Sequence, residues 1–133
     1  MRARHVARAA QLMALVPWLA GCAGARARTD QRPLLEGMRP DSVLVAPGSV
    51  VAVTLTGSGF RQGSPGENTV WFGTSMMRGV TSSDEGRHIT FVVPDAIESG
   101  GGAQPAQLVT GSYPVQVETA AGKSNVLMLR VFR

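Results

Sequence analysis

Residues 49–60 read SVVAVTLTGSGF, a strictly alternating run that ends in glycine, serine and phenylalanine. Apolar side chains in such a run fall on one face of an extended chain, and small or polar ones fall on the other. Gly57 and Gly59 then allow a sharp reversal that turns Phe60 back toward the apolar face. The stretch therefore predicts a half-buried β-strand followed by a tight turn. Its apolar face consists of Val51, Val53 and Leu55.

Similar short runs rich in Val, Thr, Ile and Leu flank this stretch, with Gly, Pro, Ser and Asn between them. We expect LLEGM and SVLVA, at 34–38 and 42–46, to form one strand broken at Pro40, because proline cannot donate to a β-ladder. AAGK at 120–123 is typical of a hairpin turn. No segment has apolar residues at helical spacing, so residues 34–133 are predicted to form one all-β sandwich domain. The remaining strands are expected within NTVWFG (68–73), SMMRGVTS (75–82), RHITFVVP (87–94), GSYPVQVET (111–119) and SNVLMLRVF (124–132).

The same alternation predicts which side chains point inward from these strands. The segment DAIESGGGAQPAQLVT, at 95–110, shows no such pattern and is expected to be a long glycine-rich connection. The predicted inward residues are Val70, Phe72, Ile89, Phe91, Val93, Tyr113, Val115, Val117, Leu127, Leu129 and Val131.

Four pieces of this sequence together resemble the IPT/TIG family of immunoglobulin-like domains. They are RPDSVLVAPGSVVAVTLTGSGF from Arg39, NTVWFG, ITFVVP, and GSYPVQVETAAGKSNVLMLRVF, which ends at Phe132. Their order and spacing carry the resemblance, and the long connection at 95–110 departs from it. The resemblance implies an immunoglobulin-like sandwich of the E-set type, with about seven strands.

The first residues, MRARHVARAAQ, are basic, and about ten mostly apolar residues follow, too few to cross a bilayer as a helix. The order Leu19-Ala20-Gly21-Cys22 resembles the lipobox of bacterial lipoproteins. We expect 1–21 to be a signal peptide, Cys22 to be the lipid attachment site and 22–33 to be a flexible tether. The alternative is an ordinary secretory signal that contains a cysteine. Ala23 rather than aspartate after the cysteine implies, by resemblance to a sorting rule of some Gram-negative bacteria, an outer-membrane lipoprotein.

Removal of residues 1–21 changes the charge of the chain. The segment holds three arginines and no acidic residue, so the formal net charge falls from +4 to +1. A nearly neutral domain lacks the basic surface that nucleic acids require. A single cysteine excludes an intrachain disulfide, and no metal-ligand spacing is present, so we expect no metal and no cofactor.

Three candidates for catalytic chemistry each have a simpler interpretation. Ser58 in TGSGF lacks the features of a serine elbow or a phosphate loop. Asp84 and Glu85 are adjacent in sequence and point to opposite sides of an extended chain, which is more typical of a solvated turn. His88 is expected to face outward, with no nucleophile tied to it by any pattern. We therefore expect no enzymatic activity.

Trp71 is the candidate binding residue. Val70 and Phe72 are predicted to point inward, so the indole lies on the outer face of its strand. It either contacts a partner, with Met76 and Met77 extending an apolar patch, or is covered by the 95–110 connection or the tether. For the two methionines, the more common role is to fill the core. The expected function is a binding or scaffolding module for another envelope protein. A glycan-binding module is the alternative.

Overall fold

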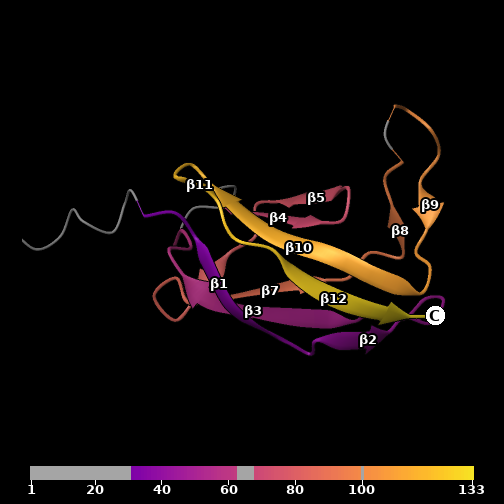
Figure 1. Cartoon of the computed structure of the whole chain (residues 1–133), viewed down its shortest axis with the longest axis horizontal. Helices are drawn as coiled ribbons and strands as arrows, with labels where there is room; N and C mark the ends of the chain where they lie inside the picture. The colour runs from indigo at the N-terminus through magenta and orange to yellow at the C-terminus, as the bar shows by residue number, and fades with distance from the viewer. Residues whose placement is uncertain (1–30, 63–67, 100) are drawn as a thin grey trace, which may run out of the picture.

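The structure is a computed structural model that describes residues 31–62, 68–99 and 101–133 (Figure 1). The predicted signal peptide, Cys22 and most of the predicted tether lie outside these residues. In the described part of the chain, no helix is long and apolar enough to span a bilayer.

The described residues form twelve β-strands, most of them in two sheets that face each other. The first sheet has the order β1-β3-β7-β6, and the second has the order β2-β12-β10-β4-β5, with β11 paired to β10. The two short strands β8 and β9 pair only with each other. The strands are β1 (Leu34–Arg39), β2 (Ser42–Leu44), β3 (Ala52–Ser58), β4 (Thr69–Phe72), β5 (Ser75–Arg78), β6 (Ser82–Ser83), β7 (His88–Val92), β8 (Ala96–Ile97), β9 (Ala106–Gln107), β10 (Gly111–Thr119), β11 (Gly122–Lys123) and β12 (Leu127–Phe132).

This strand order is that of an immunoglobulin-like sandwich, in which strands far apart in sequence are neighbours in each sheet. A tyrosine corner accompanies it. Near the start of β10, the Tyr113 hydroxyl donates to the carbonyl oxygen of Val109 at 2.8 Å and accepts from its N–H at 3.1 Å. The predicted all-β sandwich is confirmed. The strands outnumber the seven expected for two reasons. Two predicted runs are each split, which adds β2 and β6, and the short strands β8, β9 and β11 lie in segments predicted as a connection and a turn.

The predicted core is confirmed at the positions that alternation selected. In β3, Val53 and Leu55 are fully buried, and the threonines that follow them, Thr54 and Thr56, are half-buried on the other face. Phe72 of β4 stacks on Tyr113 of β10 with ring centroids 5.1 Å apart. Of the predicted inward residues, Val51 and Leu127 are only partly buried.

Gly57 and Gly59, at the end of β3 and just after it, have different roles. Gly59 has a φ of +76° and makes the predicted reversal, which places Phe60 in the core at 5% exposure. Gly57 is still within β3, opposite a β-bulge between Leu35 and Gly37 of β1. A Cβ at Gly57 would overlap the carbonyl oxygen of Leu34, so a close approach of two strands, and not a turn, requires this glycine.

The segment around Pro40 corrects a prediction. LLEGM and SVLVA were expected to be halves of one strand, but β1 pairs with β3 in the first sheet and β2 pairs with β12 in the second. The chain changes sheet at Pro40, after a cis peptide bond from Arg39. β2 with β12 is the one parallel pair among the described strands.

The connection at 95–110 contains structure that its glycine content did not predict. β8 and β9 form a short ribbon, and Leu108, just after β9, is fully buried. The N–H of Leu108 donates to the carbonyl oxygen of Asp95 at 3.0 Å. In Figure 1 the ribbon lies at the end of the sandwich that holds the C-terminus, whereas β1 begins at the opposite end.

Two asparagines at predicted strand ends brace the backbone. Asn68 is 1% exposed, and its side chain makes three hydrogen bonds, two to the backbone of Arg61 and one to the carbonyl oxygen of Val80. Asn125 makes a similar pair of bonds to the N–H and carbonyl oxygen of Leu35. These amides replace strand pairing where neighbouring backbones diverge.

Candidate binding face

Trp71 lies on the outer face of the second sheet, as its neighbours in β4 predicted. Val70 and Phe72 are fully buried, and Trp71 between them is half-buried on the other side. In the sheet it stands directly opposite Met76 of β5 and Gln116 of β10. Met77, the second methionine of the predicted patch, packs against the core instead.

An apolar band crosses this outer face. Met76, on the edge strand β5, is 39% exposed and sits beside Trp71. Met128 of β12, 52% exposed, stands opposite Pro114 of β10, and Val126 lies two residues before it. The band thus runs from β5 through β4 and β10 to β12, with the half-buried polar side chain of Gln116 beside Trp71. We define the apolar band as Trp71, Met76, Pro114, Val126 and Met128.

Polar side chains hold the indole of Trp71 in place. Its Nε1–H donates to Oε2 of Glu118 at 2.7 Å, and Nζ of Lys123 lies 4.7 Å from the ring centroid. A cation at this distance over an indole is favourable, and the hydrogen bond satisfies the one polar group of the ring. Side chains of β10 and β11 therefore fix the orientation of the Trp71 indole.

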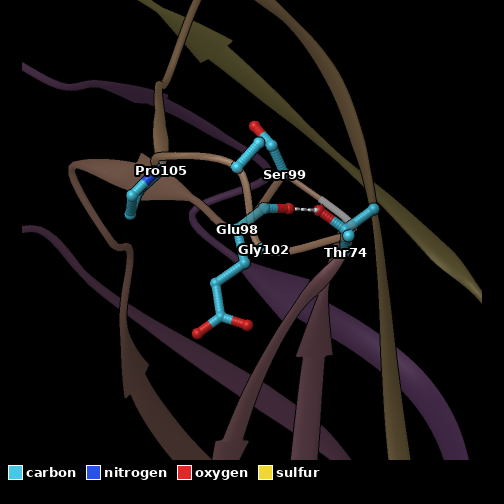
Figure 2. Close-up of a pocket in the computed structure, with 7 residues that line it drawn as sticks. Thr74, Glu98, Ser99, Gly102 and Pro105 are labelled. Atoms are coloured by element: carbon cyan, nitrogen blue, oxygen red, sulfur yellow. Dashed lines mark hydrogen bonds between the residues drawn. The ribbon is translucent and has the colours of Figure 1, made fainter.

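The 95–110 connection contacts the turn between β4 and β5. The sequence had left open that this connection covers Trp71. Thr74 Oγ1, in the turn between β4 and β5, donates to the carbonyl oxygen of Glu98 at 2.6 Å, and the N–H of Glu98 donates to Ser75 Oγ at 3.1 Å. A pocket of about 310 Å³ opens beside this junction, and in Figure 2 the Glu98 carboxylate points away from the Thr74 bond. Among the described residues lining the pocket, Glu98 is the one ionisable side chain, which leaves no acid–base pair there.

The outer face of the first sheet is mostly polar, although Val92 of β7 is also exposed on it. His88 is half-buried and points outward as predicted, opposite Thr56 of β3 and Ser83 of β6. Its Nδ1 lies 2.8 Å from Oδ2 of Asp84. Within the described residues, no hydroxyl is hydrogen-bonded to this imidazole, so the face contains no nucleophile paired with a base.

The predicted turn at Asp84 and Glu85 is confirmed. Both residues have a positive φ, 50° and 56°, and Gly86 follows with 79°. The N–H of Arg87 closes the turn onto the carbonyl oxygen of Ser83 at 3.1 Å. Across residues 31–62, 68–99 and 101–133, no group of three or more His, Cys, Asp or Glu residues converges as metal ligands do.

No protein-family model matches this chain, and no curated protein matches its sequence.

Of the residues in the apolar band, the sequence pattern predicted Trp71 and Met76. Pro114, Val126 and Met128 were not predicted as site residues. The alternation that predicted their neighbours to be buried also predicts that these three face outward. What alternation could not indicate is that β12 and β5, separated in sequence, flank the same pair of strands.

Proposed function

We propose that this chain is a non-catalytic binding module, held at the bacterial envelope by a lipid on Cys22, that docks another envelope protein through the apolar band. The exposed band is the observation that carries the proposal. Contiguous apolar surface is costly in water, and on soluble domains it commonly marks a site of protein interaction.

The anchor and the family rest on the sequence. The lipobox-like order before Cys22 supports lipidation, and Ala23 supports the outer membrane as the destination. The assignment to the IPT/TIG type rests on the four sequence pieces and is compatible with an immunoglobulin-like strand order. Domains of this architecture carry many functions, so the binding role is argued from the band and not from the fold.

The surroundings of Trp71 count against the alternative, a glycan-binding module. Stacking on a sugar needs an open aromatic face, and Lys123 lies over the indole. Phe132, also exposed on this side of the sheet, is at the far end of β12 beside Leu44, so the two rings do not form one platform.

A photo-crosslinking amino acid at position 128 tests the proposal in the full-length chain in its native cells. Met128 is exposed in the band and makes no hydrogen bond that the substitution would break. We expect a discrete adduct with another protein, identified by mass spectrometry. The matched control is position 90, because Thr90 is exposed on the polar outer face of the first sheet. Equal labelling at both positions, or no protein adduct at 128, would overturn the proposed function.

A further inference from the structure

Three cationic side chains border the apolar band on the same face of the second sheet. Arg78 of β5 stands opposite Thr69, and Lys123 of β11 stands opposite Glu118, so both lie on one side of the band. Arg130 of β12 lies on its other side, two residues beyond Met128. All three side chains belong to exposed residues.

These cations are not neutralised within the fold. In the described part of the chain, the ion pairs are Arg87 with Glu36 and His88 with Asp84, both associated with the first sheet. The acid on the band's own face, Glu118, accepts the indole N–H of Trp71. Glu118 keeps its negative charge in that hydrogen bond and stands opposite Lys123, so the face carries three positive charges against one negative charge, although the chain without its leader is nearly neutral.

We propose that the apolar band receives an acidic protein surface: apolar side chains of the partner cover the band, and carboxylates of the partner pair with Arg78, Lys123 and Arg130. This inference rests on the proposed function and names the chemistry of its partner. An apolar centre with a charged rim is the usual anatomy of a protein interface, and rim charges of one sign steer and select a partner of the other sign.

A second copy of this chain fits the face less well. In a two-fold dimer the same patch meets itself, so the three cations of one copy would approach the three of the other, with only the one carboxylate of Glu118 on each copy to offset them. Like charges brought together across an interface oppose binding. The charge pattern thus favours a different, acidic protein as the occupant.

Charge reversal measures this selectivity. In chains carrying the crosslinker at position 128, we expect Arg78→Glu and Arg130→Glu each to lower the adduct yield about threefold, and the double variant about tenfold. Arg39→Glu is the matched control, because Arg39 is exposed on β1 of the first sheet, away from the band. In isolated membranes, raising the ionic strength from about 0.05 to 0.5 M should lower the yield of the unreversed chain and leave that of the double variant less affected.

The outcomes separate this inference from the proposed function. Both are supported if the reversals act as expected and the crosslinked peptide of the partner is rich in Asp and Glu. An adduct that survives the double reversal unchanged, or whose peptide is not acidic, overturns the inference and leaves the proposed function standing. Adducts only with lipid or with a second copy of the chain overturn both. Unchanged thermal unfolding of the reversed variants shows that the fold is intact.

Discussion

At the scale of single residues, the orientation of Trp71 depends on one carboxylate. Glu118 accepts the indole N–H at 2.7 Å, and Lys123 covers the ring. The sequence placed Trp71 on the outer face from the parity of its neighbours. It could not indicate these partners, because β10 and β11 are distant in sequence and their register with β4 is set by the whole sheet.

Glu118→Ala should release the indole and expose it to water. We expect a red shift of Trp71 fluorescence and a loss of about 1 kcal/mol in the free energy of unfolding, since the bond is only partly buried. Trp18 lies in the predicted leader, so Trp71 is the one tryptophan expected in the processed chain. Glu118→Gln keeps an acceptor and should retain the wild-type emission. An Ala variant with unshifted emission would show that the hydrogen bond does not hold the ring.

The two bracing asparagines allow a matched test of burial. Asn68→Ala leaves the backbone groups of Arg61 and Val80 without partners in a buried site, and we expect it to lower the free energy of unfolding by about 3 kcal/mol. Asn125 is exposed, so water can replace its bonds to Leu35, and Asn125→Ala should cost about 1 kcal/mol. Urea unfolding measures both. Equal losses would mean that burial does not set the difference.

At the scale of elements, alternation predicted the long strands and not the short ones. β3, β7, β10 and β12 each bury every second residue, which is the signal of a sheet with one face on the core. β8 and β9 have two residues each, too few for any period. The sequence also did not predict the change of sheet at Pro40. The residues before and after Pro40 have the same local pattern, and only their different partner strands, β3 and β12, place them in different sheets.

The close approach of β1 and β3 makes Gly57 sensitive to any side chain. Gly57→Ala places a Cβ against the carbonyl oxygen of Leu34, and relief requires the bulged strand to move. We expect the free energy of unfolding to fall by at least about 2 kcal/mol in urea unfolding. Gly37→Ala is the control in the same bulge, because a Cβ there meets no atom within 4 Å, and it should change stability by less than about 0.5 kcal/mol. A tolerated Gly57→Ala would contradict the close approach.

At the scale of the whole molecule, the proposed binding face and the predicted anchor are separate parts. The described chain enters at the end of the sandwich where β1 begins, and the ribbon and C-terminus lie at the other end (Figure 1). The apolar band lies on a side, across β5, β4, β10 and β12. Loss of the anchor should therefore change where the domain is and how often it meets a membrane-bound partner, without changing the face itself.

Cys22→Ser tests this separation. Cys22 is the only cysteine, so the variant should lose all fatty-acid label and be released from membranes, since two or three acyl chains hold a protein far more firmly than one. Thermal unfolding of the released chain should match wild type, and crosslinking from position 128 should fall because the partner is no longer confined with it. The control is Cys22→Ser with Thr90→Cys, which restores a thiol at an exposed strand position and should remain unlabelled. Label on Cys22→Ser would exclude Cys22 as the attachment site, and label on the double variant alone would show that an exposed thiol suffices for labelling. Undiminished crosslinking from the released chain would show that the face binds its partner without the help of the membrane.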